Sequence, residues 1–161
     1  RATIVTEQGD IVIDLFPRDA PVTVNNFIFL ARSGWYDGVT FHYVVPGYLA
    51  QTGDPSNTGR GGPGYTIPDE HNNGLIFDRE GLVAMAHPAG IFDSAGSEFF
   101  ITLGPLRPSY EWDGQYTIFG IVTAGMDVVH RLTPRNANDP IRFPDPPPGD
   151  RVITIAIEEG A

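Results

Sequence analysis

The sequence predicts a mainly β fold in which short strands close into a barrel and two helices pack against it. Seven or eight short apolar runs are separated by turns, and only two segments show helical periodicity. The 19 glycines and 15 prolines among 161 residues place much of the chain in loops. No repeat or change of composition divides the chain, so we expect residues 1–161 to form a single domain.

The first two predicted strands, Ala2–Val5 and Ile11–Leu15, form a hairpin. In the second strand, Ile11, Ile13 and Leu15 lie on one face and Val12 and Asp14 on the other, as expected for a strand with one buried side. Gly9-Asp10 lies between the two runs and is a strong signal for a hairpin turn.

A helix is expected next. Asp19 is the candidate N-cap and Pro21 lies in the first turn, where proline is tolerated. Gly34 ends the helix. The apolar stripe that would face the core consists of Val24, Phe27, Ile28 and Ala31.

Glycines and prolines separate the remaining predicted elements. A short helix from Met126 to Leu132 is followed by an excursion, Asn136–Gly149, whose five prolines predict a rigid surface segment. Because successive strand residues face opposite sides, Phe99 and Phe100 cannot both point inward. The predicted strands of this part are Thr40–Val45, Leu49–Gly53, Leu82–Ala86, Phe99–Leu103, Thr117–Val122 and Val152–Ile157.

Composition excludes several classes of function. The formal charge is −10, all ten basic residues are arginine, and this balance argues against nucleic acid as a partner. An acidic surface of this kind either serves solubility or favours basic peptides. No apolar run is long enough to span a bilayer. The absence of cysteine rules out thiol chemistry and leaves the compartment open. We expect a soluble protein that is cytoplasmic or, if a leader was removed, periplasmic or exported.

Five segments, in order along the chain, resemble the cyclophilins, the peptidyl-prolyl cis-trans isomerases, and specifically their prokaryotic kind. The strongest is Phe41–Asp54, FHYVVPGYLAQTGD, which is similar to the family signature FHR followed by PGF and QGGD. The resemblance implies an eight-stranded antiparallel β-barrel capped by two α-helices. The other four segments are residues 20–27, residues 69–86, residues 94–101 (SAGSEFFI) and residues 112–120 (WDGQYTIFG).

The reaction that the resemblance implies needs neither nucleophile nor metal, so no cofactor is expected. An X–Pro bond isomerises over a barrier of about 18–20 kcal/mol because the amide nitrogen shares its lone pair with the carbonyl. A catalyst must grip the proline ring and aim a donor at the amide as it twists. The proline pocket implied by the resemblance consists of Tyr48, Leu49, Phe100 and Trp112.

The donating part of the implied site differs from the family pattern. Tyr43 replaces the catalytic arginine, while Gln51 matches the glutamine that orients it. Glu98 replaces a glutamine and, by strand alternation, shares a face with Phe100. Glu111 aligns with a position where many family members have tryptophan. A gap of one residue in this alignment would place Trp112 at that position and leave Glu111 outside the pocket.

The resemblance places the remaining implied contacts on the rim. Tyr116 replaces a histidine, and Ala86 with His87 matches the edge-strand positions whose backbone pairs with the substrate. Arg107 could substitute for the missing arginine, but a solvated loop arginine is the simpler interpretation of it, and Arg60 is interpreted in the same way.

Other groups of polar residues give weaker indications of function. The four histidines, His42, His71, His87 and His130, lack the spacing of metal ligands, and no metal site is predicted. His42 is interpreted as a buried, hydrogen-bonded histidine. Asp69-Glu70-His71 is interpreted as a solvated loop.

Two hypotheses follow. The first is a peptidyl-prolyl isomerase of reduced or substrate-restricted activity. The second is a non-catalytic binder of proline peptides, a chaperone or an assembly factor. In both, the partners are proline-containing peptides or proteins, the chain is expected to be a monomer, and cyclosporin is expected to bind weakly. Glu98 and Glu111 would favour a basic residue before the proline.

Overall fold

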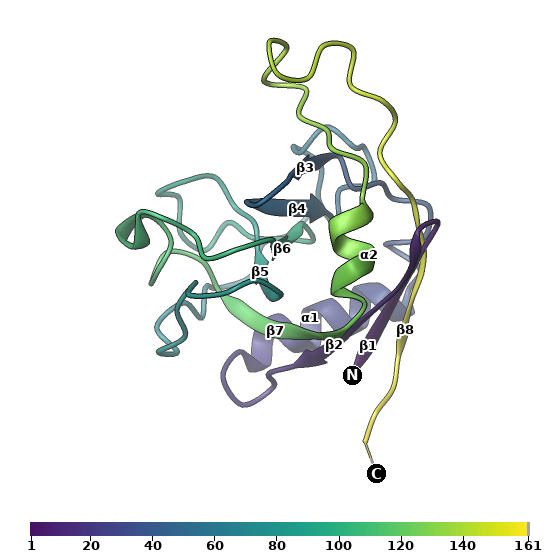
Figure 1. Ribbon diagram of the computed structural model, residues 1–161. Coiled ribbons are helices and arrows are strands. Elements are labelled where there is room, and N and C mark those ends of the chain that lie inside the picture. Colours follow the sequence, from purple (N-terminus) through teal and green to yellow (C-terminus); the bar gives the residue numbers. More distant parts are fainter. Residues whose placement is uncertain (161) are drawn as a thin grey trace.

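The computed structural model describes residues 1–160 and contains one sheet of eight antiparallel strands (Figure 1). The sheet order is β3-β4-β6-β5-β7-β2-β1-β8. Two α-helices, α1 (Pro21–Arg32) and α2 (Met126–Arg131), and a 3-10 turn, η1 (Ser109–Glu111), complete the elements. The strands are β1 (Ala2–Thr6), β2 (Gly9–Leu15), β3 (Tyr43–Val45), β4 (Leu49–Thr52), β5 (Leu82–Met85), β6 (Phe99–Thr102), β7 (Ile118–Ala124) and β8 (Val152–Ile157).

The sheet curls until its two outer strands, β3 and β8, approach each other. Hydrogen bonds between the segment before β3 and the segment around the start of β8 join them. The Phe41 amide donates to the Asp150 carbonyl at 2.9 Å, and the Val152 amide donates to the Val39 carbonyl at 2.8 Å. The predicted fold class, a mainly β barrel with two helices, is confirmed. Closure runs through this narrow seam instead of a full ladder between the two strands.

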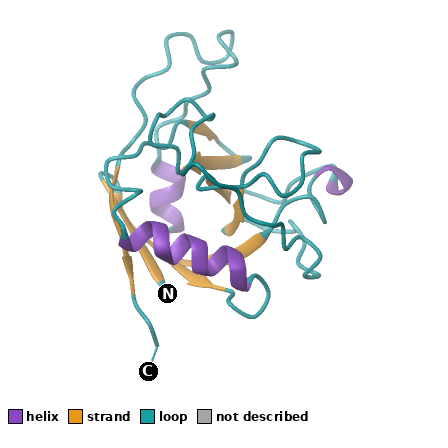
Figure 2. Cartoon of the chain, turned by 180° about the vertical axis from the view of Figure 1, so that it is seen from behind, coloured by secondary structure: helices purple, strands orange, loops and turns teal. Residues whose placement is uncertain are grey.

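Helix α1 lies across the barrel, as the view from behind shows (Figure 2). Its inward face carries Phe27, whose ring centroid lies 5.4 Å from that of Phe99 and 5.3 Å from that of Phe119. Phe100, the next residue of β6, belongs to a second apolar cluster on the opposite face and stacks on Phe77 at 5.9 Å. The predicted alternation of Phe99 and Phe100 is therefore confirmed.

The first hairpin turns two residues earlier than predicted. Gly9 pairs with Thr6 in the ladder, so the turn consists of Glu7 and Gln8 and not of Gly9-Asp10. The Thr6 hydroxyl donates to the Gly9 carbonyl at 2.7 Å, and Gly9 has a φ of +127°, a conformation that favours glycine. This glycine opens the strand because only it accepts the backbone conformation there.

The N-terminus of α1 is capped from a distant loop, and the predicted N-cap Asp19 is wrong. Ala20 is the N-cap and offers no side-chain acceptor. Instead, Glu70 accepts hydrogen bonds from the amides of Val22 and Thr23 at 3.0 and 2.9 Å. A carboxylate at this end also interacts favourably with the helix dipole. The interpretation of residues 69–71 as a solvated loop is wrong, because Glu70 caps the helix and the Asp69 side chain is 2% exposed.

Several predicted strands are longer than the observed ones. The strand predicted at Thr40–Val45 begins only at Tyr43, because residues 39–41 serve the seam with residues 150–152. The three strands β4, β5 and β6 each end one residue before the predicted end. Residues 136–149 project from the barrel as the predicted excursion (Figure 1). The excursion starts from Arg135, whose amide and carbonyl pair with Val44 of β3.

Candidate functional site

A pocket of about 230 Å³ opens on the outer face of the sheet, away from the barrel interior. Its wall combines residues of β4 and β6 with the segments that follow β5 and η1. The lining residues are Leu49, Gln51, Gly59, Ala86, His87, Pro88, Glu98, Phe100, Trp112 and Tyr116.

Strand register explains why these side chains meet. Gln51 of β4 lies opposite Phe100 of β6 on one side and opposite Tyr43 of β3 on the other. Residues directly opposite in antiparallel strands share a face of the sheet. The three side chains therefore form a row across β3, β4 and β6. Leu49 and Glu98, each two residues along its chain from a member of this row, lie on the same face.

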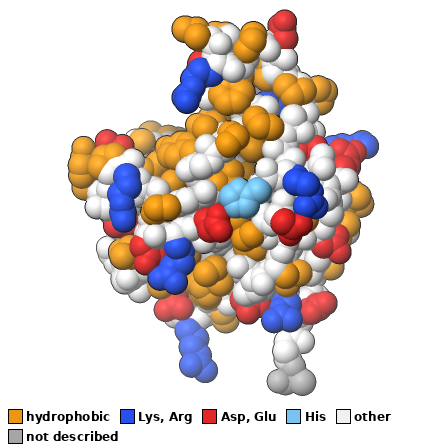
Figure 3. Space-filling view, in the orientation of Figure 1, with side chains coloured by type: hydrophobic (Ala, Val, Ile, Leu, Met, Phe, Trp, Pro, Cys, Tyr) orange, Lys and Arg blue, Asp and Glu red, His pale blue; other side chains and the backbone are white. Residues whose placement is uncertain are grey.

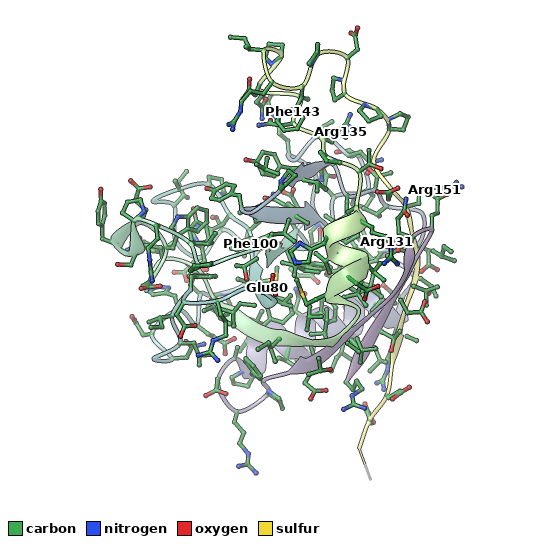
Figure 4. All side chains as sticks on the ribbon, viewed as in Figure 1. Glu80, Phe100, Arg131, Arg135, Phe143 and Arg151 are labelled. Atoms are coloured by element: carbon green, nitrogen blue, oxygen red, sulfur yellow. The ribbon has the colours of Figure 1, made fainter. Side chains whose placement is uncertain are left out.

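The apolar part of the pocket is preformed. Phe100 is 2% exposed and Leu49 is 4% exposed, so both belong to the second apolar cluster. The Trp112 ring packs edge-on against Phe100 at 5.9 Å and tilts against Tyr116 at 5.2 Å. Figure 4 shows Phe100 near the centre of the view. A wall of packed aromatic rings suits a small apolar ring such as that of proline.

The polar part consists of three coupled side chains. The Gln51 amide donates to Glu98 Oε1 at 3.2 Å, and His42 Nε2 lies 3.3 Å from the same oxygen. Burial raises the pKa of Glu98 to about 7, and burial also lowers the pKa of His42. Both groups therefore favour their neutral forms. His42 is buried as interpreted, but its Nδ1 has no hydrogen-bond partner within residues 1–160.

A buried carboxylate organises the loop that closes this polar side. Asp54 is fully buried, and it accepts hydrogen bonds from the amides of Ser56, Thr58, Gly59, Arg60 and Gly61. Burial alone would raise the pKa of Asp54, but these bonds and the Ser56 hydroxyl hold it below its ordinary value. The loop brings Gly59 so close that a Cβ there would lie 3.4 Å from His42 Nε2.

Two backbone groups beside the pocket have no partner. Neither the Ala86 carbonyl nor the His87 amide bonds to another backbone group in the part of the chain described. The prediction that these residues lie on an edge strand is wrong, because β5 lies between β6 and β7 and ends at Met85. The groups are open because the chain leaves the sheet there. The His87 ring is fixed by contacts to the Pro88 and Gln115 carbonyls and stacks on Tyr116 at 4.4 Å.

Three of the predicted site residues do not line the pocket. Tyr48 packs edge-on against Trp112 from outside at 5.7 Å. Glu111 lines a separate cleft with Tyr110 and Gln115, while Trp112 lines the pocket. Trp112 lines both clefts, and the assignment of Glu111 or Trp112 to the family's tryptophan position stays a prediction. Tyr43 stands at the outer end of the row and borders a neighbouring cleft.

Sequence reasoning missed the residues that the loops supply. Gly59 and Pro88 line the pocket, and no motif identified them. Burial raises the pKa of Tyr43, with Arg142 and Asp139 of the excursion acting on it in opposite directions. The excursion therefore reaches the site, which its proline content alone did not indicate. Arg107, one candidate substitute for the family arginine, does not line the pocket.

We expect Glu98→Gln to raise the free energy of unfolding at pH 8 and to change it less at pH 5. A carboxyl whose pKa rises from 4.5 to about 7 on folding holds its proton more tightly in the native state. The native state therefore loses stability as pH rises from about 4.5 to 7, and the penalty is complete above that range. Urea unfolding at both pH values should show a difference on the order of 1–3 kcal/mol. Equal effects at the two pH values, or the same pattern in Glu111→Gln, would contradict this.

Comparison with known proteins shows the family to which the chain belongs. The family model described as "Cyclophilin type peptidyl-prolyl cis-trans isomerase/CLD" matches residues 1–155. The chain belongs to this family. A peptidyl-prolyl cis-trans isomerase of Helicobacter pylori is 40% identical over 133 residues, which cover 81% of this chain and 78% of the relative. The mouse "Peptidylprolyl isomerase domain and WD repeat-containing protein 1" is 43% identical over 136 residues.

The structural comparison agrees. A cyclophilin type peptidyl-prolyl cis-trans isomerase of Cryptosporidium parvum, solved in the presence of the dipeptide Ala-Pro, matches with a TM-score of 0.84. It is 30% identical, and 99% of each chain is covered. The chain spans only 20% of the mouse relative's length. Since relatives come from bacteria and eukaryotes alike, the prokaryotic-like character stays a prediction. No helix within residues 1–160 is long and apolar enough to cross a membrane.

Proposed function

We propose that this chain isomerises X–Pro bonds in peptides and proteins, and that the proline ring occupies the pocket of Leu49, Phe100 and Trp112. The observation that carries the proposal is the preformed aromatic pocket with two open backbone groups beside it. An extended peptide can pair with the Ala86 carbonyl and the His87 amide while its proline enters the pocket. Main-chain pairing anchors the segment before the proline while the pocket holds the ring, so the amide between these two anchors is the group that twists.

The row of Tyr43, Gln51 and Phe100 supplies the other parts of catalysis, which are the contact to the proline ring and the hydrogen bond to the twisted amide. Phe100 holds the ring, and the Gln51 amide faces the same pocket. Because burial raises the pKa of Tyr43, its phenol stays protonated near neutral pH and can donate a hydrogen bond. A neutral hydroxyl at the outer end of the row stabilises the twisted amide less than a guanidinium would. We therefore propose a slow or substrate-restricted isomerase.

Two-dimensional NMR exchange spectroscopy on a short Ala-Pro peptide tests the proposal. The protein should accelerate cis–trans exchange, and Trp112→Ala should reduce the acceleration about tenfold or more because a wall of the pocket is lost. Phe29→Ala removes an aromatic ring from the exposed face of α1 and serves as the matched control. Equal loss in both variants, or none in Trp112→Ala, would show that the proline binds elsewhere.

The alternative is a proline-peptide binder that has lost catalysis. Three specific changes favour it: Tyr43 in place of arginine, Glu98 in place of glutamine and Tyr116 in place of histidine. Such a protein would bind the same peptide in the same pocket without altering the exchange rate. Binding and exchange measured in one sample separate the two functions.

Cyclosporin-type inhibitors are expected to bind weakly. In the family they contact the arginine position, where this chain has Tyr43, and the tryptophan position. The pocket keeps Trp112, so the expected loss comes from the missing guanidinium and from Glu98 on the rim. Titration followed by the fluorescence of Trp112 should give a dissociation constant above about 1 μM. Nanomolar binding would contradict the role given to Tyr43.

We also propose that the chain acts as a monomer. Part of each outer edge of the sheet is occupied, since residues 39–41 pair with residues 150–152 and Arg135 pairs with Val44 of β3. These contacts shorten the strand edge that could pair with a second copy. Analytical ultracentrifugation should give a single species near 17.5 kDa, and a stable dimer at micromolar concentration would contradict this.

A further inference from the structure

A second cleft, of about 370 Å³, adjoins the proline pocket on the Tyr43 side. It shares Gln51 and Gly59 with the proline pocket, whereas Ala86 and His87 line the pocket but not this cleft. The loop ordered by Asp54 forms one wall, and the start of the excursion forms the other. The polar side chains that line it include Tyr43, Asn57, Thr58, Arg60, Arg135 and Asn138.

The arginines of this cleft lack carboxylate partners. In this acidic chain, six of the ten arginines lie within ion-pair distance of an aspartate or glutamate, namely Arg1, Arg32, Arg79, Arg131, Arg142 and Arg151. Within residues 1–160 the other four, Arg18, Arg60, Arg107 and Arg135, have none. Two of these four, Arg60 and Arg135, line this cleft, and Arg60 also lines a neighbouring cleft on the Ala86 and His87 side of the pocket.

Arg135 is held in position by neutral groups. Its Nε donates to the Pro147 carbonyl at 2.7 Å, and its Nη1 donates to the His42 carbonyl at 2.9 Å. Backbone bonds to Val44 fix the residue itself. Figure 4 shows Arg135 at the base of the excursion, close to β3. Carbonyl oxygens orient a guanidinium without cancelling its charge, so the cation is preorganised while Nη2 remains available.

No carboxylate of the described residues lines the cleft. Asp54 keeps its negative charge beneath the cleft, and its oxygens are held by the loop amides and do not contact the side chain of either arginine of the cleft. Asp139 of the excursion lies 3.9 Å from Arg142, which balances its charge. Hydrophobic side chains gather between the excursion and the barrel in the space-filling view, and low-dielectric surroundings strengthen the field of nearby charges (Figure 3). The lining of the cleft therefore carries two arginines and no carboxylate, with Glu98 behind Gln51 and His42, on a protein of formal charge −10.

We propose that this cleft binds an anionic side chain, a carboxylate or a phosphate, at a position that follows the proline of the substrate. The inference rests on the proposed function, because the segment before the proline is assigned to Ala86 and His87. The residues after it leave the pocket past Gln51 and Gly59, which are the positions shared with the cleft. Arg135 and Arg60 receive the anion, and Asn138 and Tyr43 offer further polar groups.

Capped peptides that differ in one residue test the site. Ala-Ala-Pro-Ala-Glu is expected to bind about tenfold more tightly than Ala-Ala-Pro-Ala-Gln at low salt. The advantage should vanish in 0.5 M NaCl, because exposed charges are screened. A peptide with glutamate placed before the proline should show no advantage. A phosphoserine peptide distinguishes the sources: tighter binding than glutamate identifies phosphate as the preferred anion, and equal or weaker binding identifies carboxylate.

Charge-matched variants locate the effect. Arg60→Gln and Arg135→Gln should each reduce the tenfold preference for glutamate to about threefold, while Arg18→Gln, which removes an unpaired arginine elsewhere, should leave it unchanged. Arg60 makes no side-chain hydrogen bond in residues 1–160, so its variant tests the site even if Arg135→Gln disturbs the excursion. Equal affinity for the glutamate and glutamine peptides would overturn the anion site. Failure to bind any of these proline peptides would instead overturn the proposed function.

Discussion

Replacing Tyr43 with arginine is expected to accelerate X–Pro isomerisation by about 30- to 1000-fold. A charge-assisted contact that strengthens in the transition state contributes roughly 2–4 kcal/mol, which corresponds to this range of rates. Tyr43 lies opposite Gln51 in the ladder, so an arginine there starts from the same face as the pocket. Its longer side chain can reach past Gln51 toward the bound amide.

The gain should depend on the guanidinium and not on charge alone. Tyr43→Lys supplies a cation without the planar, multi-donor geometry and should recover much less of the rate. Tyr43→Phe removes only the hydroxyl and should lower the rate of the wild-type protein. Exchange spectroscopy on one peptide gives all three rates. If Tyr43→Arg bound the peptide without any gain in rate, catalysis would not be limited by the residue at position 43.

Replacing Asp54 with alanine is expected to lower the free energy of unfolding by about 3–5 kcal/mol. The carboxylate accepts hydrogen bonds from five successive or nearly successive loop amides, and its removal leaves these part-buried donors without a partner. The loop would then release Gly59 and Arg60, so both the proline pocket and the cationic cleft would lose a wall.

The same carboxylate predicts acid sensitivity. Because the folded-state pKa of Asp54 lies below the ordinary value of 3.8, its stabilisation is complete above that value and is lost as pH falls below it. Urea unfolding between pH 2 and pH 6 should show this loss in the wild type and not in Asp54→Ala. Asp19→Asn, an exposed aspartate before α1, is the control. Stability of Asp54→Ala within about 1 kcal/mol of the wild type would contradict the role of the loop.

Local patterns predicted most of the fold. Alternation in β2, the apolar stripe of α1 and the glycine and proline breaks placed every strand to within a few residues. Alternation also predicted that Phe99 and Phe100 face opposite sides, and the structure places Phe99 inside the barrel and Phe100 on the face that carries the pocket. These features depend on neighbours in sequence, so the sequence contains the information directly.

The contacts that shape the site join residues far apart in the chain. Glu70 caps a helix 47 residues away, which no local capping rule identifies. The packing of Trp112 against Phe100 depends on the path of η1, which sequence neighbours do not fix. Arg135 acquires its place only through the carbonyls of His42 and Pro147. Long-range hydrogen bonds of this kind follow from tertiary packing and not from the pattern around each residue.

The most direct test measures binding and isomerisation of one Ala-Pro peptide in a single NMR sample with saturating wild-type protein. Chemical-shift changes of the Trp112 indole report occupancy of the pocket, and exchange cross-peaks report the rate. The account predicts both: a perturbed Trp112 and an exchange rate above that of free peptide but below that with Tyr43→Arg. A perturbed Trp112 with the exchange rate of the free peptide would contradict it and identify a proline-peptide binder.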